Sequence, residues 1–297
     1  NTTAGSNVAV GYAALSANTT GTNNTSIGTG SLELNTTTSG NTAVGTNALE
    51  ANVAANNTAV GLNALVANTT GADNVAIGAD SLDANSTGSE NTAIGRNALG
   101  ANTTAGGNTA IGRNALLVNT TGAANIAIGE SALDANTTAS NNLAIGNAAL
   151  GANTTGTANV AVGKSAGLAI TTGENNTAIG YQTLKSATTT HGNTALGENA
   201  LRDCTGTENT AIGSSAMFDG TGGSENVAVG NDTLIVNAGD ENVAVGGDSL
   251  KANTTGSENI GIGYESLKAN TTASENVAVG MQALTTVTTS GNNTAVG

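Results

Sequence analysis

Few residues of this 297-residue sequence could take part in covalent chemistry. It has one histidine, His191, and one cysteine, Cys204, and a cysteine that pairs with a histidine can act as a nucleophile. Both residues lie in segments that we expect to be outer turns, and we interpret them as incidental surface residues. Neither a zinc-ligand spacing nor a Gly-x-x-x-x-Gly-Lys phosphate loop occurs. The sequence therefore predicts no catalytic residue, no bound cofactor and no enzyme activity.

Carboxylates are a second group of candidates, because they recur at one place in a repeated motif. Five of them fall just before the motif in consecutive repeats, and we call these five the acidic column. Stacked carboxylates repel one another, and calcium could bridge them. We favour a solvated acidic edge, because single carboxylates do not supply the roughly six to eight oxygens that calcium takes. The acidic column comprises Glu208, Glu225, Glu241, Glu258 and Glu275, and Asp73 and Glu90 hold the same place in earlier repeats.

Asn-Thr-Thr or Asn-Ser-Thr also recurs, and it matches the acceptor pattern for N-glycosylation. The pattern arises easily in a sequence so rich in asparagine and threonine, and the match by itself does not establish a modification. The matching asparagines are Asn18, Asn35, Asn68, Asn85, Asn102, Asn119, Asn136, Asn153, Asn253 and Asn270.

All these candidates are positioned by a repeat. The motif Asn-x-Ala-[Ile/Val]-Gly begins 18 times; 14 of the 17 spacings are 17 residues and three are 16. The full unit reads N-x-A-[IV]-G-x-x-[AS]-L-x-x-N-T-T-G-x-x. Its recurring places are named here the motif asparagine, the strand alanine, the flanking pair (x and [IV], on either side of that alanine), the motif glycine, the repeat leucine and the turn asparagine. We predict structural roles for the first five of these places, for example at Asn91, Ala93, Ile94, Gly95 and Leu99, and at Asn276, Ala278, Val279, Gly280 and Leu284.

No linker interrupts the series, so we predict a single continuous domain over residues 1–297, cut from a longer fibre protein. A repeat of this length is too short for a helix pair, which takes about 33 residues. It suits one turn of a parallel β-solenoid, with one short strand at the motif and a second strand or extended arm at [AS]-L. The motif glycine would supply a positive φ at a corner, and the motif asparagines would bond amide to amide. We therefore predict an all-β parallel solenoid of about 17 turns.

The strand alanine predicts self-association. Alanine occupies this place in 16 of 18 copies, with Ser26 and Gly261 as the exceptions. We expect the flanking pair to pack inside each turn against the repeat leucine, and the alanine to face a sister chain. The alternative places alanine in a narrow single-chain interior and the flanking pair outside, where a row of exposed aliphatic side chains would need another explanation.

Composition excludes several partners and classes of protein. The net charge of −14 with only seven Lys and Arg argues against nucleic acid and against an anionic membrane surface. No apolar run approaches the roughly 20 residues of a membrane span, so no membrane insertion by this segment is expected. Only 9% of residues are charged and 1% aromatic, which is too few large side chains for a conventional core.

The motif copies, such as Asn91-Thr92-Ala93-Ile94-Gly95 and Asn276-Val277-Ala278-Val279-Gly280, resemble the head repeats of YadA-like trimeric autotransporter adhesins. Similar arrays occur in phage tail-fibre proteins. The resemblance covers the whole chain, although the 17-residue period with its Asn-Thr-Thr-Gly turn is longer than the usual head repeat. It implies a left-handed β-roll, a homotrimer and an extracellular location on a cell or virion surface.

We therefore expect a structural or adhesive fibre shaft that holds or forms a surface-attachment region, with a host-surface receptor or glycan as its partner. Two alternatives stay open. One is a subunit of a self-assembling extracellular filament. The other is a solenoid whose threonine ladders bind ice or a polysaccharide, by resemblance to Thr-rich antifreeze solenoids.

Overall fold

The computed structural model describes residues 4–297, which form one strand of three residues in each repeat, joined by turns. Each strand consists of the strand alanine, or its replacement, and the flanking pair. The strands are β1 (Val8–Val10), β2 (Thr25–Ile27), β3 (Thr42–Val44), β4 (Thr58–Val60), β5 (Val75–Ile77), β6 (Thr92–Ile94), β7 (Thr109–Ile111), β8 (Ile126–Ile128), β9 (Leu143–Ile145), β10 (Val160–Val162), β11 (Thr177–Ile179), β12 (Thr194–Leu196), β13 (Thr210–Ile212), β14 (Val227–Val229), β15 (Val243–Val245), β16 (Ile260–Ile262), β17 (Val277–Val279) and β18 (Thr294–Val296).

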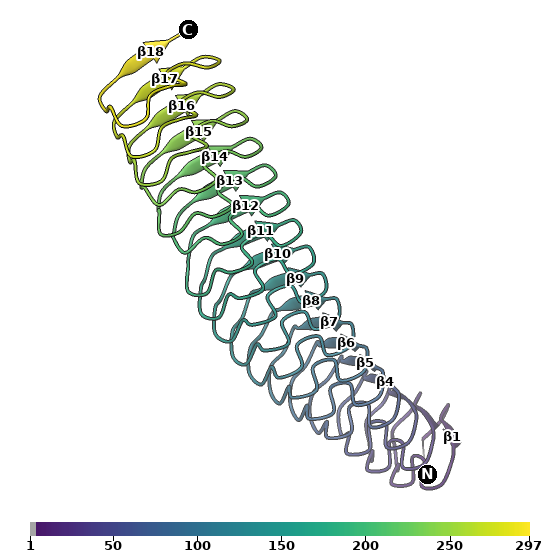
Figure 1. Ribbon diagram of the computed structural model, residues 1–297. Helices are drawn as coiled ribbons and strands as arrows, with labels where there is room; N and C mark the ends of the chain where they lie inside the picture. The colour runs from purple at the N-terminus through teal and green to yellow at the C-terminus, as the bar shows by residue number, and fades with distance from the viewer. Residues whose placement is uncertain (1–3) are drawn as a thin grey trace. The chain divides into compact units, whose positions relative to one another are not determined.

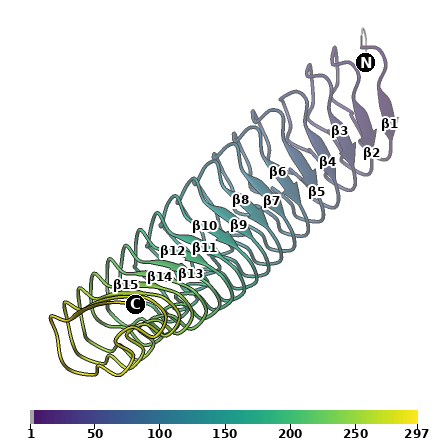
Figure 2. The ribbon, with the colours of Figure 1, turned by 90° about the horizontal axis from the view of Figure 1, so that it is seen from above.

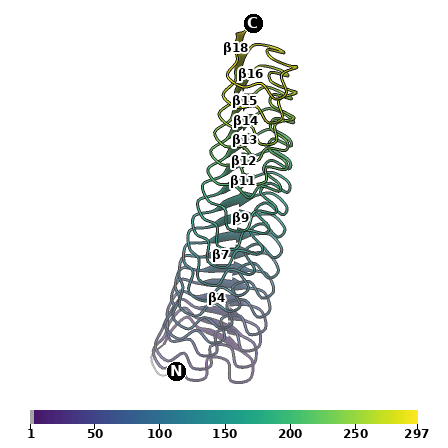
Figure 3. The same ribbon diagram turned by 60° about the vertical axis from the view of Figure 1, so that its left-hand side comes forward.

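The chain divides into two compact units, unit 1 up to Ala148 and unit 2 from Ala149 to Gly297. Unit 1 contains β1–β9, which stack in parallel as the arrows in Figures 1 and 2 show. Unit 2 contains β10–β18 in the same arrangement, and several of its arrows are visible in Figure 3. Consecutive strands pair residue for residue, so Ala93 lies beside Ala110 in unit 1 and Ala178 beside Ala195 in unit 2. The predicted parallel β-solenoid is confirmed in each unit, while the single domain over 1–297 stays a prediction.

The predicted second strand at [AS]-L is wrong. The repeat leucine lies in a turn and has a positive φ, 53° at Leu99, in the left-handed region that costs a non-glycine residue about 1–2 kcal/mol. Two features offset this cost. The Leu99 side chain is fully buried, and its backbone N–H donates to the carbonyl of Ala115 in the next turn at 3.0 Å. The leucine therefore turns the chain and fills the core at the same position.

The orientation predicted for the strands is also wrong. Ala93 and Ala278 are fully buried inside their own turns, whereas Ile94 and Val279 are only partly covered and face outward. The expectation that alanine packs against a sister chain is therefore incorrect, and the alternative that was left open describes the structure. Leu284, one of the predicted structural residues, is half-buried where its equivalents in most other repeats are buried.

The two exceptions to alanine show why this place must be small. The hydroxyl of Ser26, at the strand-alanine place, lies 2.6 Å from that of Ser31, which directly precedes the repeat leucine. At Gly261, a β-carbon would lie 2.7 Å from the hydroxyl of Ser249 and 3.1 Å from that of Ser266. The strand alanine thus faces the residue before the repeat leucine across a narrow interior. A larger side chain would have no room.

The interior is lined by asparagine as well as by alanine and leucine. Asn91 donates Nδ2–H to the Ala105 carbonyl at 2.9 Å and to the Oδ1 of Asn74 at 3.2 Å, and its own Oδ1 accepts the backbone N–H of Asn108 at 3.0 Å. Asn276 continues this pattern in unit 2, donating Nδ2–H to the Oδ1 of Asn259 at 3.1 Å. The predicted amide ladder of the motif asparagines is therefore present in both units, and it satisfies buried polar atoms from turn to turn.

The motif glycine is required for two reasons at once. Gly95 has a φ of +133°, which side-chain-bearing residues rarely adopt, as the sequence predicted for this corner. In addition, a β-carbon at Gly95 would lie 2.5 Å from the carbonyl oxygen of Gly112 in the next turn. Gly280 repeats both features, with a φ of +130° and the oxygen of Gly297 at 2.5 Å. Backbone conformation and the close stacking of turns therefore both exclude a side chain here.

Candidate functional site

The structure does not bring the two candidate catalytic residues together. His191 lies on the exposed surface, while Cys204 is fully buried and replaces a turn asparagine, so the prediction of a surface cysteine is wrong. The Cys204 thiol donates to the Gly206 carbonyl at 3.8 Å and accepts the Nδ2–H of Asn209 at 3.7 Å. Burial raises the pKa of the Cys204 thiol to about 11. The thiolate needed for nucleophilic attack is therefore strongly disfavoured.

The acidic column lies on the surface of unit 2. Its five glutamates are exposed, and all have a φ between 57° and 60°. Each backbone N–H donates to the preceding turn, as Glu208 does to the carbonyl of His191 at 3.0 Å and Glu275 to that of Ser257 at 3.1 Å. No group of three or more His, Cys, Asp or Glu within residues 4–297 is arranged to hold a metal ion. The solvated acidic edge stays a prediction, and calcium bridging stays its untested alternative.

The asparagines of the glycosylation pattern lie inside the solenoid. Asn102 donates Nδ2–H to Asn85 Oδ1 at 2.9 Å and to the Ala105 carbonyl at 3.0 Å. A glycan on such a nitrogen would break these bonds and would have no space in the folded turn. Burial therefore speaks against glycosylation of the folded chain at the buried asparagines of the pattern, Asn18, Asn35, Asn68, Asn85, Asn102, Asn119, Asn136, Asn153, Asn253 and Asn270.

These turn asparagines form a second internal ladder, which is altered within unit 2. Four consecutive repeats replace the asparagine with Ile170, Ala187, Cys204 and Gly220. In the turn of Ala187 the hydroxyl of Thr190 is buried without a hydrogen-bond partner. In unit 1 the equivalent hydroxyl, that of Thr38, donates to the turn asparagine Asn35. The orphaned hydroxyl of Thr190 therefore follows from the missing amide at Ala187.

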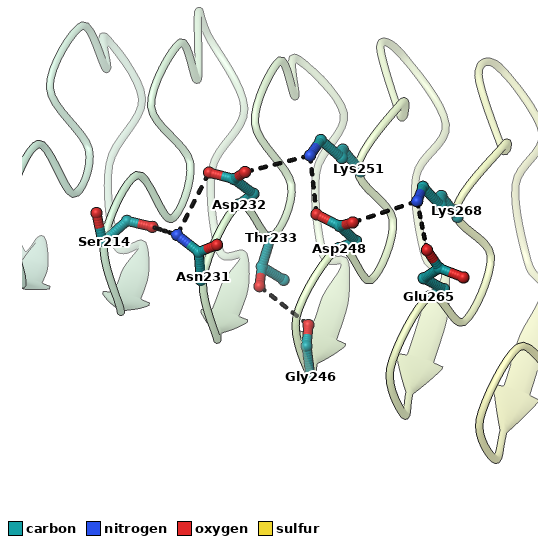
Figure 4. Close-up of polar contacts among 9 residues, drawn as sticks. All are labelled: Ser214, Asn231, Asp232, Thr233, Gly246, Asp248, Lys251, Glu265 and Lys268. Atoms are coloured by element: carbon teal, nitrogen blue, oxygen red, sulfur yellow. Dashed lines mark hydrogen bonds and ion pairs between the residues drawn. The ribbon is translucent and has the colours of Figure 1, made fainter.

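An ion-pair ladder that we did not predict crosses three turns of unit 2 (Figure 4). Lys251 contacts Asp232 at 3.2 Å and Asp248 at 2.8 Å, and Lys268 contacts Asp248 at 3.2 Å and Glu265 at 2.5 Å. Hydrogen bonding from Lys251 lowers the pKa of Asp248, and that from Lys268 lowers the pKa of Glu265. The spacing of about one repeat between these charges was the signal in the sequence that could have revealed the ladder. Because Lys251 and Lys268 keep 34% and 37% of their side chains exposed, water screens the pairs, and we expect them to align the turns with little effect on stability.

The outward flanking pairs form the most distinctive surface, which we call the outer strand face. All 36 flanking-pair residues of the 18 strands are Thr, Val, Ile or Leu, and none is charged. Ile77 and Ile126 of unit 1 are 39% and 40% exposed, and Ile212 and Ile262 of unit 2 are 38% and 39% exposed. Each unit contributes 18 of these side chains from nine consecutive strands, and nine of the 36 are threonines while the rest are aliphatic.

Comparison with known proteins adds no assignment: no protein-family model matches this sequence, and no curated protein matches it. Across residues 4–297, no helix is both long and apolar enough to cross a membrane. Of the features described above, the outer strand face is the one whose extent and chemistry fit a binding partner.

Proposed function

We propose that this chain is a non-enzymatic shaft segment of an extracellular trimeric fibre, such as a cell-surface adhesin or a phage tail fibre. The outer strand face carries this proposal. Its stripe of Thr, Val, Ile and Leu side chains runs through every strand of each unit, where a monomer in water would be expected to carry some charged side chains. Sister chains that pack their faces together would remove this surface from water.

The size of the face agrees with this role. The 18 flanking-pair side chains of one unit approach the roughly 20–30 residues that each partner contributes to a standard protein interface. The absence of charged residues in all 36 flanking-pair positions removes the main cost of desolvating it. The number of three chains and the left-handed winding come from the resemblance of the motif to YadA-like head repeats.

The mechanism is mechanical. The motif-asparagine ladder and the parallel strand ladder connect successive turns within each unit, and the turn asparagines add a second ladder where they are present, so bending must break several hydrogen bonds at once. A stiff shaft of this kind would hold a binding tip away from the surface that carries it. Weak contacts of a receptor or glycan with repeated surface columns would add up through avidity.

The test is the oligomeric state of the full chain by sedimentation equilibrium, combined with two matched variants. Ile77 lies on the outer strand face and Val118 lies outside the strands, and their side chains are 39% and 37% exposed. Ile77→Lys would place one ammonium group from each chain inside the assembly, and we expect it to dissociate the trimer. Val118→Lys should leave the trimer intact. A monomeric parent chain, or equal behaviour of the two variants, would refute the proposal.

The threonines of the flanking pairs support a second candidate, binding of ice or a polysaccharide. Thr92 and Thr109 lie side by side on the outer strand face and are half-exposed, so they form part of an outward ladder. By contrast, Thr103 of the outer turn donates its hydroxyl to the carbonyl of Thr120 at 3.3 Å. Thermal hysteresis by the monomeric chain, lost on Thr92→Val/Thr109→Val substitution, would favour ice binding over the shaft.

A further inference from the structure

Two rows of residues border the outer strand face. The leading row consists of the residue before each motif asparagine, and the trailing row consists of the residue after each motif glycine. In the turn of β6, Glu90 belongs to the leading row and Arg96 to the trailing row, and both side chains are exposed. Five residues lie between them, and the three of β6 are extended, so Glu90 and Arg96 lie beyond opposite ends of the strand, at most about 20 Å apart. One chain therefore presents these two charges at opposite edges of the same face.

Within each turn, the leading-row and trailing-row residues never carry charges of the same sign. In the five turns of the acidic column the trailing-row residue is uncharged. Where the trailing row carries Glu130 or Glu198, the leading row of the same turn carries the uncharged Ala124 or Gly192. The turn of β6 is the one that carries charge in both, and there the signs are opposite. The uncharged trailing residues of the acidic column are Ser214, Asn231, Gly247, Tyr264 and Met281.

Neither charge of the β6 turn is neutralised within its own chain. The ion pairs among residues 4–297 include Arg113 with Glu130 and the lysine ladder of unit 2, but they include neither Glu90 nor Arg96. Arg96 is thus an exposed guanidinium at one edge of the outer strand face, and Glu90 is an exposed carboxylate at the other.

Symmetry then determines which turns can meet. In a closed ring of identical parallel chains, the leading edge of one chain meets the trailing edge of the next at the same level, because any stagger generates an open helix. At the same level Glu90 of one chain faces Arg96 of its neighbour. A stagger of one turn would instead bring Arg96 to Asp73 and Arg113 to Glu90, and Arg113 would have to leave Glu130, its partner in its own chain.

We infer that Glu90 and Arg96 form an ion pair between neighbouring chains and hold the parallel chains in register. This inference rests on the proposed self-association through the outer strand face. The second copy is the partner that fits, because it supplies both an uncharged face of equal size and the complementary charge at each edge. In this arrangement the acidic columns of the three chains lie at separate corners, opposite uncharged neighbours.

The first test is disulfide trapping in the full chain. Glu90→Cys/Arg96→Cys should form covalent species that stop at the trimer, since the extended strand between the two positions holds them beyond the roughly 7 Å limit for a bridge within one chain. Asp73→Cys/Arg96→Cys is the matched control, and it should not cross-link. Cys204 is fully buried and does not compete.

A charge reversal gives the second test. Glu90→Arg should weaken association at least severalfold, by placing like charges at each contact between chains, and Glu90→Arg/Arg96→Glu should restore it. If sedimentation shows trimers while only the Asp73/Arg96 pair cross-links, or neither pair does, the register is wrong and the shaft proposal survives. If the unmodified chain sediments as a monomer, the shaft proposal fails and this inference fails with it.

Discussion

Replacing Asn91 with alanine tests whether the asparagine ladder holds the turns together. The Asn91 side chain makes three hydrogen bonds: to the Ala105 carbonyl at 2.9 Å, to the Oδ1 of Asn74 at 3.2 Å, and from the backbone N–H of Asn108 at 3.0 Å. The substitution removes all three and leaves a small void at a fully buried position. We expect a loss of stability centred on the turn that follows.

The magnitude can be worked out atom by atom. The Ala105 carbonyl keeps a bond from Asn102 Nδ2 at 3.0 Å, and Asn74 Oδ1 keeps one from the backbone N–H of Asn91 at 3.0 Å. Only the N–H of Asn108 loses its partner, and a buried unpaired donor costs about 1–3 kcal/mol. The other two bonds contribute about 1 kcal/mol each. The expected loss of unfolding free energy is therefore about 3–5 kcal/mol.

Two measurements check this value. Guanidinium denaturation measures the loss of unfolding free energy for the whole chain, although repeat arrays can unfold in parts. Hydrogen exchange measures the protection of the Asn108 amide itself. Thr92→Val is the matched control, because Thr92 is the next residue along and faces outward; its effect should stay within about 0.5 kcal/mol. If Asn91→Ala costs less than about 1 kcal/mol and leaves the exchange of the Asn108 amide unchanged, the ladder does not hold the turns and the reasoning fails.

Three further predictions follow from other positions. Gly95→Ala should lower the unfolding free energy by more than about 3 kcal/mol in a denaturant titration, because its positive φ and the close stacking of turns both exclude a methyl group. Gly100→Ala is the control: its methyl group would meet no atom closer than 3.4 Å, so the substitution should be neutral or slightly stabilising. Ala187→Asn should raise the unfolding midpoint, because the new amide can accept from the orphaned Thr190 hydroxyl; a lowered midpoint would show that neighbouring side chains already fill the space. With a pKa of about 11, Cys204 should react with iodoacetamide at neutral pH about a hundredfold more slowly in the folded chain than in guanidinium, and comparable rates would contradict its burial.

The period of the sequence was sufficient to predict the stacked turns, because parallel strands stay in register only if every turn has nearly the same length. The three 16-residue repeats agree with this reasoning. Asn52 bonds to the carbonyl of Ala54 two residues on, whereas Asn68 in a full repeat bonds to that of Gly71 three residues on. The missing residue therefore lies in the outer turn.

The orientation of the strands could not be predicted from the same pattern. Alternation shows that the flanking pair shares one face and that alanine lies on the other, but it does not show which face is inside. Aliphatic side chains were expected inside on grounds of size. In the structure the repeat leucine and two asparagine columns already occupy the interior, and only a methyl group fits opposite them. Leucine at a φ near 50° and asparagine as a core residue are both uncommon, so sequence rules assign them to a strand and to a surface turn.

The candidate site depends on this reversal. Alanine, from which the sequence predicted self-association, lies inside, and the side chains on the other face of the strand lie at the surface and form the outer strand face. In each turn the interior takes the smaller residue, and the bulkier aliphatic or β-branched pair lies outside without a charge of its own. A chain selected to remain a monomer would be expected to place lysine or glutamate at some of these 36 positions, as soluble proteins do at exposed sheet surfaces. The consistent absence of charge is the physical reason to look for a second copy of this chain on that face before any other ligand.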